Sequence, residues 1–198
     1  MWQFFVKGGL AMYPLTVCSI LALIIIIERI LFFSRIPNDD PEYQTLKKLL
    51  SQGKINEAKV LSDRWNSAIS RVTASAVKQW EADKRLLESA IQSAGETELN
   101  HLQRGLSILD TIVTASPLLG LLGTVTGIIK TFLALSASNG QAAQLSAGIA
   151  EALYTTAFGL SIAIPALFFV NIFYGIAEKR ALDLNSKCRE IITILQEG

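Results

Sequence analysis

One acidic residue, Glu151, stands at the edge of a long apolar stretch and is the first candidate for chemistry. It is followed by 26 uncharged residues before the next acidic residue, Glu178. In a helix, Thr155 would lie one turn from Glu151, with Thr156 beside it. A carboxylate with neighbouring hydroxyls can relay a proton or ligate a small cation. These residue types and their spacing therefore indicate an ion path.

The depth of Glu151 in a membrane decides how informative it is. If its helix begins near Ala142, Glu151 lies nine residues inside, or about 14 Å. A bare carboxylate at that depth costs at least ~2.5 kcal/mol, so it must face a protein interior or a water-filled cavity, or stay protonated. The alternative is a position at the outer interface, where the carboxylate is harmless and carries no function.

A second group of small and hydroxyl-bearing residues lies upstream, at positions 117–131. Most of them recur at steps of three and four and therefore share one face of a helix. Small residues let helices approach closely in lipid, so a packing seam is the simplest interpretation. Packing alone does not explain two threonines seven residues apart. The group comprises Pro117, Gly120, Gly123, Thr124, Gly127 and Thr131, of which all but Gly123 share the face.

Enzymatic chemistry finds little support in the sequence. The glycines before Lys130-Thr131 lack the strand and the spacing of a phosphate loop, and Lys130 is expected to reach the outer interface instead. His101 is the only histidine, and Cys18 and Cys188 fall in different parts of the chain. Neither a zinc site nor a disulfide framework is therefore expected. We expect no enzyme activity, no metal and no cofactor.

Three uncharged blocks would position these side chains. The chain is 51% hydrophobic and 18% charged, and its charges avoid blocks of 18, 19 and 26 residues. A helix rises about 1.5 Å per residue, so each block approaches or exceeds the thickness of a hydrocarbon core. The first block ends in Glu28-Arg29 rather than at a small-residue cleavage site, which favours a retained anchor over a signal peptide. We predict an all-α integral membrane protein with three transmembrane helices.

Lys and Arg residues outside the blocks set the expected orientation. Residues 34–104 contain 11 of them and the tail from 178 contains 4, whereas the first nine residues contain 1 and residues 136–148 none. The N-terminus is therefore expected outside and the C-terminus in the cytoplasm. The large loop also carries 10 acidic residues, so no nucleic-acid surface is expected. The expected order is an external interfacial segment (1–9), a first span (10–33), a cytoplasmic helical loop (34–105), a second span (106–135), an external turn (136–144), a third span (145–177) and a cytoplasmic tail (178–198).

The polar parts of the chain are expected to be helical as well. Short helices are predicted at Glu42–Ser51 and Asn56–Trp65. From Ser67 to Leu135 apolar residues recur mostly at helical spacing, which predicts one unbroken helix of about 70 residues, roughly 100 Å long. The third span is expected to continue past Tyr174 as far as Gln196. Together the second and third helices would extend into a cytoplasmic helical bundle, with frayed tails as the alternative.

Two stretches in combination resemble the ExbB, TolQ and MotA family of inner-membrane motor proteins. They run from Pro117 to Phe132 (PLLGLLGTVTGIIKTF) and from Gly148 to Ala166 (GIAEALYTTAFGLSIAIPA). The three-span layout is similar to the ExbB and TolQ branches, ExbB first, rather than to the four-span MotA branch. The resemblance implies that Glu151 is a lumen glutamate, that Thr124 and Thr156 are the functional threonines and that Pro117 and Pro165 are the motif prolines. Thr155 joins the expected ion pathway, and the residues expected to line the lumen and pack the helices are Pro117, Gly120, Gly123, Gly127, Thr131, Gly148, Gly159 and Pro165.

The same resemblance implies partners and a location. It implies a homopentamer in the bacterial inner membrane, with the N-terminus in the periplasm, around a dimer of single-span ExbD- or TolR-like proteins that carry an intramembrane aspartate. Flow of protons, or of sodium as the alternative, would move this partner and energise an outer-membrane transport system, indirectly through a TonB-like protein. A TolQ-like cell-envelope motor subunit and a non-conducting membrane scaffold are the competing interpretations.

Overall fold

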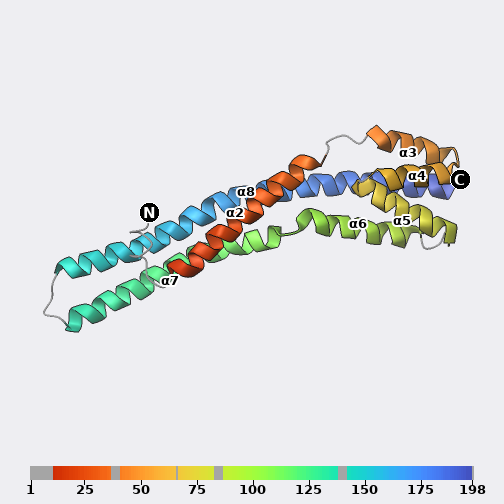
Figure 1. The fold of residues 1–198 in the computed structure, drawn as a ribbon. Helices are drawn as coiled ribbons and strands as arrows, with labels where there is room; N and C mark the ends of the chain where they lie inside the picture. The colour runs from red at the N-terminus through yellow and green to blue at the C-terminus, as the bar shows by residue number, and fades with distance from the viewer. Residues whose placement is uncertain (1–10, 37–40, 66, 83–86, 138–141, 198) are drawn as a thin grey trace. The chain divides into compact units, whose positions relative to one another are not determined.

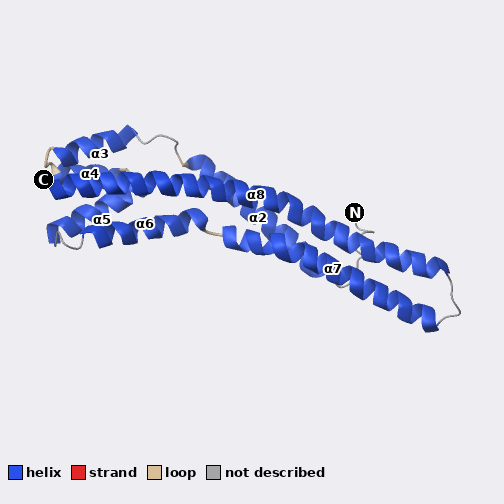
Figure 2. Cartoon of the chain, turned by 180° about the vertical axis from the view of Figure 1, so that it is seen from behind, coloured by secondary structure: helices blue, strands red, loops and turns tan. Residues whose placement is uncertain are grey.

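The computed structural model describes residues 11–36, 41–65, 67–82, 87–137 and 142–197. The expected interfacial segment 1–9 and residues 138–141 of the expected turn lie outside these ranges. The described residues form helices and no strand (Figures 1 and 2), which confirms the all-α prediction. Contacts divide the chain into two compact units: a first unit of Met1–Phe33 and Gly105–Phe173, and a second unit of Ser34–Arg104 and Tyr174–Gly198.

The first unit is built from three apolar helices. They are α2 (Met12–Arg35), α7 (Leu106–Ala137) and the part of α8 (Ala142–Glu197) that ends at Phe173. Each contains a segment long and apolar enough to cross a membrane. Their other faces leave many large apolar side chains exposed, as lipid or a neighbouring chain would require. The buried cluster where they meet contains Met12, Leu15, Ala22, Ile26, Leu106, Leu109, Ile112, Ile162, Ala166, Val170 and Phe173.

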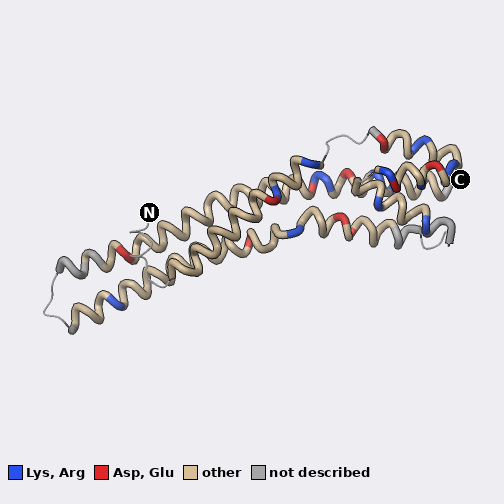
Figure 3. Tube along the Cα trace, in the orientation of Figure 1, with Lys and Arg blue, Asp and Glu red and all other residues tan. Residues whose placement is uncertain are grey.

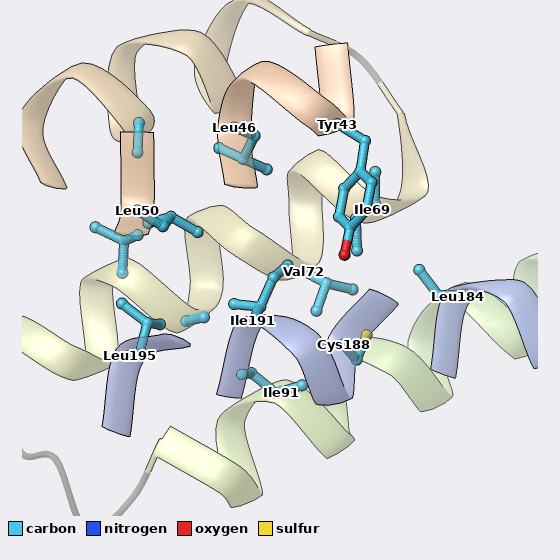
Figure 4. Packing of buried hydrophobic residues seen from close by; sticks show 13 residues of the cluster. Tyr43, Leu46, Leu50, Ile69, Val72, Ile91, Leu184, Cys188, Ile191 and Leu195 are labelled. Atoms are coloured by element: carbon cyan, nitrogen blue, oxygen red, sulfur yellow. The ribbon is translucent and has the colours of Figure 1, made fainter. Parts of the chain in front are cut away.

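The second unit is a bundle of shorter, more polar helices. It contains α3 (Pro41–Ser51), α4 (Ile55–Arg64), α5 (Ala68–Ala82), α6 (Leu87–Gln103) and the part of α8 from Tyr174 onward. Charged residues are frequent along these helices and sparse along α2 and α7 (Figure 3). Apolar side chains from α3, α5, α6 and α8 meet in one core (Figure 4). Its members include Tyr43, Leu46, Leu50, Ile69, Val72, Ile91, Leu184, Cys188, Ile191 and Leu195.

The predicted unbroken helix from Ser67 to Leu135 is wrong. The structure divides it into α5, α6 and α7, and α6 packs against α5. Between α6 and α7, Gly105 adopts φ +77°, a left-handed conformation that glycine reaches without a steric penalty. Leu109 then donates a backbone hydrogen bond of 3.1 Å to the Gly105 carbonyl, which starts α7. The helical spacing of apolar residues continues up to Gly105 because α6 has an apolar face of its own, which it buries against α5.

The prediction that the third span continues past Tyr174 is confirmed, since α8 is one helix from Ala142 to Glu197. It has an internal proline at Pro165. The predicted short helices are found at α3 and α4, within one residue at each boundary. α8 therefore contributes both to the apolar first unit and to the core of the second.

Polar contacts between α3 and α8 stabilise the second unit at the edge of its core. The Tyr43 hydroxyl donates to Glu190 Oε2 at 2.7 Å, and Lys47 Nζ lies 3.1 Å from the same oxygen. The hydrogen bond from Tyr43, followed by that from Lys47, lowers the pKa of Glu190 below its ordinary value. Burial, reinforced by Glu190, raises the pKa of Tyr43. Burial also raises the pKa of the Cys188 thiol to about 11, so both groups stay protonated in the folded unit at neutral pH.

Candidate functional site

The candidate site lies where α7 and α8 cross at backbone distance. A Cβ added to Gly127 would lie 2.9 Å from Ala152 Cβ, and one added to Gly120 would lie 2.9 Å from the Thr155 carbonyl oxygen. Such distances leave no room for a side chain. We call this contact between residues 116–131 of α7 and 148–159 of α8 the glycine seam. It brings six of the expected packing residues together: Gly120, Gly123, Gly127, Thr131, Gly148 and Gly159.

The register of the glycine seam shows that α7 and α8 are antiparallel. Gly148 lies against Thr131 at one end, and Gly159 lies against Ser116 at the other, where an added Cβ would be 2.5 Å from the Ser116 carbonyl oxygen. Numbers therefore rise along α8 while they fall along α7. In lipid, the hydrophobic effect does not bring helices together, so their association depends on close packing. Because glycine has no side chain, the two backbones can approach closely at each of these positions and gain van der Waals contacts.

Thr155 lies inside the glycine seam. It is 2% exposed, and its hydroxyl is 2.7 Å from the Ala152 carbonyl and 3.2 Å from the Gly120 carbonyl, positions in which it donates within α8 and across to α7. A Cβ at Gly123 would lie 2.5 Å from Thr155 Oγ1. The Thr155 hydroxyl is therefore hydrogen-bonded at the contact between the two helices and helps to fix their register.

The other two expected threonines differ in their hydrogen bonding. Thr124 is 8% exposed, and its hydroxyl donates to the Leu121 carbonyl at 2.6 Å. Thr156 has a buried Oγ1 with no hydrogen-bond partner among the described residues. Its Cα faces α7, 2.9 Å from the position of a Gly120 Cβ. Of the three, only Thr156 keeps a buried hydroxyl with its hydrogen-bonding capacity unused.

Glu151 points away from the glycine seam. It is exposed, whereas the next residue, Ala152, is 1% exposed and packs against Gly127. Pro165, further along α8, is exposed as well, and Pro117 on α7 is half-buried. The chain by itself therefore does not enclose the Glu151 carboxylate. Within a membrane, its surroundings must be supplied by another protein surface or by water, because lipid would make the charge costly.

Two polar residues of the first unit were missed by sequence reasoning. Arg29 of α2 is 2% exposed, and its Nε and Nη2 donate to the Glu28 carboxylate at 2.6 and 2.7 Å. Its guanidinium lies 4.5 Å from the ring centre of Phe32, a cation–π contact. The spacing of Arg29 and Phe32 was the available signal. Ser116 is fully buried, and its Oγ has no partner within the described residues; its position before Pro117 was the signal there.

Comparison with known proteins decides the family. Residues 64–186 match the family model described as the MotA/TolQ/ExbB proton channel family. The chain belongs to this family. The matched segment includes the glycine seam, Glu151 and the three threonines, so the MotA/TolQ/ExbB match coincides with the site. With three candidate spans in the described residues, this member of the family is a multi-pass membrane protein.

Individual relatives agree with the family assignment. The chain is 33% identical over 181 residues to a biopolymer transport protein, ExbB-like 1, of Synechocystis sp., covering 89% of this chain and 71% of that one. It is 32% identical over 167 residues to biopolymer transport protein exbB1 of Vibrio cholerae, covering 80% and 72%. Over a shorter segment of 83 residues it is 43% identical to the Tol-Pal system protein TolQ of Haemophilus influenzae, covering 41% and 36%.

Proposed function

We propose that this chain is the ion-conducting subunit of an inner-membrane motor of ExbB–ExbD type and that protons pass at Glu151. The observation that carries the proposal is an exposed carboxylate on an apolar helix, inside the segment that matches a proton channel family. Leaving such a carboxylate against lipid costs about 2.5 kcal/mol or more. A hydrated lumen shared with other chains removes that cost and gives the carboxylate a role.

The threonines would act at different points around Glu151. Thr124 and Thr156 are the family's functional threonines by resemblance, and the buried, unused hydroxyl of Thr156 can accept or pass a proton. The one hydroxyl proton of Thr155 lies within reach of the Ala152 and Gly120 carbonyls inside the glycine seam, so we assign Thr155 to holding α8 in position beside the path. The glycines of the seam, with Pro117 and Pro165, would shape the walls.

The exposed position of Glu151 favours an assembly rather than a lone chain. We propose a homopentamer whose second and third spans surround two single-span partner helices of the ExbD or TolR type, each with an intramembrane aspartate. A proton that neutralises this aspartate would let the partner turn within the ring. Each charge that crosses 100 mV releases about 2.3 kcal/mol, which the partner would transmit, indirectly through a TonB-like protein, to an outer-membrane transport system.

The orientation follows from charge. The N-terminus would lie in the periplasm and the second unit in the cytoplasm, because Lys and Arg concentrate in residues 34–104 and in the tail. In this orientation Glu151 lies nearer the periplasmic end of α8 than Thr156 does. A TolQ-like cell-envelope motor is the alternative, favoured by the 43% identity to TolQ over 83 residues. In either case the ion path is the same.

Replacing Glu151 tests the proposal in cells. Glu151→Gln keeps the size of the side chain and removes its titration, so the complex should assemble and co-purify with its single-span partner while energised transport is lost. Glu178→Gln makes the same chemical change on an exposed residue of α8 in the second unit and should behave as wild type. Normal energised transport in the assembled Glu151→Gln complex would contradict the proposal and favour the scaffold interpretation.

A further inference from the structure

A second carboxylate, that of Asp110, is exposed on α7 in the first unit. α7 contains only one other charged residue, Lys130, near its opposite end. Between these two charges, many of the exposed side chains of α7 are large and apolar. They include Leu118, Leu121, Leu122, Val125, Ile128 and Ile129. Asp110 is therefore a charge on a helix whose exposed surface otherwise mostly suits lipid.

Contacts with α2 give the level of Asp110 in the first unit. α2 and α7 are antiparallel neighbours, because an added Cβ would lie 3.7 Å from Ile25 Cγ2 at Gly105 and 3.0 Å from Ala11 Cβ at Gly123. Residues 11–25 of α2 carry no charge, and many of their large apolar side chains are exposed, as lipid requires. The part of α7 between the two contacts, which includes Asp110, therefore lies beside the apolar part of α2.

Asp110 lies well inside this apolar level. It follows Gly105 by five residues, whereas Glu28, the first charged residue after Ile25, lies three residues beyond the contact in the opposite direction. Eight helical rises place Asp110 about 12 Å deeper than Glu28. A carboxylate at that depth that its own chain leaves exposed is costly against lipid, so it needs water or another protein surface.

Asp110 also shares a face of α7 with two residues expected in or beside the ion path. Pro117 and Thr124 follow it at steps of seven residues, and such a series drifts by only about 20° at each step. Thr114, one turn from Asp110, is exposed, and its hydroxyl donates to the Asp110 carbonyl at 3.2 Å. The helix face that carries Thr124 therefore carries a carboxylate and a hydroxyl at its other end.

We propose that Asp110 is a second carboxylate of the ion path, at the opposite end of α7 and α8 from Glu151. This inference rests on the proposed function. Gly127 packs against Ala152, the neighbour of Glu151, and Asp110 lies 17 residues before Gly127, or about 26 Å along α7. The two carboxylates would thus lie near the two ends of a hydrocarbon core. In the proposed orientation, Asp110 is at the cytoplasmic end.

At this position Asp110 can receive a proton and release it. A proton that arrives through water in the lumen binds one oxygen of the ionised carboxylate. The carboxyl group then gives this proton to water on the cytoplasmic side, so no other reactant is consumed. In the competing interpretation Asp110 is a solvated boundary residue, and its charge has no effect on proton flux.

Proton flux into vesicles that contain the whole complex tests the role of Asp110. Asp110→Asn should lower the flux by about tenfold or more, because a positioned proton acceptor is lost, and Asp110→Glu should retain most of it. Asp63→Asn makes the same change on an exposed residue of α4 and should equal the wild type. Wild-type flux in an assembled Asp110→Asn complex overturns the proposal. If Glu151→Gln is inactive in the same assay, only the role of Asp110 fails, whereas normal flux in both variants overturns the proposed function as well.

Chemical restoration of the carboxylate separates its charge from effects on folding. Asp110→Cys is assembled in a chain that also carries Cys18→Ala and Cys188→Ala, and its flux is compared with that of the parent without Asp110→Cys. The thiol is then modified with 2-carboxyethyl methanethiosulfonate, which attaches a carboxylate, or with ethyl methanethiosulfonate, which attaches a neutral group. With modification verified by mass spectrometry, we expect the carboxylate to restore most of the flux and the neutral group to restore none. Equal recovery with both reagents, or with neither, overturns the proposal.

Discussion

Gly123→Ala places one methyl group where the structure has no room for it. The new Cβ would lie 2.5 Å from Thr155 Oγ1, 2.7 Å from Thr155 Cβ and 3.0 Å from Ala11 Cβ. Forcing a methyl into a well-packed contact costs about 1–3 kcal/mol. The two closest atoms belong to the Thr155 side chain, so the clash should be relieved when that side chain is removed.

Moving the glycine from one helix to the other therefore provides a sharp test. Thr155→Gly alone destabilises, because it removes the hydroxyl that bonds to Gly120 and adds a glycine to a helix, which costs about 1 kcal/mol. In the double variant Gly123→Ala/Thr155→Gly, the methyl enters the space that Thr155 vacates. We expect the double variant to be more stable than the sum of the single changes by about 0.5–3 kcal/mol.

Gly120 supplies the matched contrast. A Cβ there would lie 2.9 Å from the Thr155 carbonyl oxygen and 2.9 Å from Thr156 Cα, which are backbone atoms that no side-chain change removes. Gly120→Ala should therefore destabilise, and its combination with Thr155→Gly should be additive. Gly175 of α8 has nothing within 4 Å of its added Cβ, so Gly175→Ala should be neutral or stabilise by up to about 1 kcal/mol.

The assay is reversible unfolding of the purified chain in mixed micelles, with the free energy of unfolding taken from a detergent titration of each single and double variant. A Gly123→Ala variant as stable as Gly175→Ala would contradict the predicted clash with Thr155. Equal coupling of Thr155→Gly to Gly120→Ala and to Gly123→Ala would also contradict the clash, because the contact would then not be with the Thr155 side chain.

Three further predictions concern residues outside the glycine seam. Gly105→Ala should lower the stability of the chain by about 1–2 kcal/mol, because at φ +77° the new alanine Cβ lies too close to the backbone. Thermal unfolding measures this loss. Arg71→Gln should destabilise the chain by about 1–2 kcal/mol, because it leaves the buried Glu98 carboxylate (6% exposed, paired at 2.5 Å) without its cation. This is less than the roughly 3–5 kcal/mol lost when a fully buried pair is broken, because Arg71 is half exposed. Adding Glu98→Gln should recover part of the lost stability. In a Cys18→Ala variant, the remaining thiol, Cys188, should react slowly with thiol reagents at pH 8–9. Burial of the protonated Cys188 thiol should stabilise the fold fully below about pH 9, and this stabilisation should be lost as the pH rises towards about 11.

Sequence patterns were sufficient for the three apolar helices, for α3 and α4 and for the close approach of α7 and α8. Uncharged length located the three apolar helices because a bilayer imposes a minimum span, and the helical spacing of Gly120 and Gly127 pointed to close packing. α3 and α4 were predicted within a residue because turn-forming residues separate them. These features depend on local composition, which a single sequence contains.

The break at Gly105 and the roles of individual hydroxyls depend on tertiary contacts. Helical periodicity continues across Gly105 because α6 must bury an apolar face whether or not it joins α7 directly. Thr155 and Thr156 are adjacent, and no local pattern shows that one hydroxyl bonds across to Gly120 while the other has no partner. Ser116 drew no attention in the sequence, because a serine within a helix normally bonds to its own backbone.

Proton flux through the reconstituted complex tests the central claim most directly. Vesicles containing the chain with its co-purified partner, a trapped pH-sensitive dye and an imposed membrane potential report how fast protons cross. We predict that Glu151→Gln lowers the flux at least tenfold, that Glu151→Asp retains part of it, and that Glu178→Gln equals the wild type. Wild-type flux in Glu151→Gln, at equal assembly, would contradict the assignment of the ion path to this carboxylate.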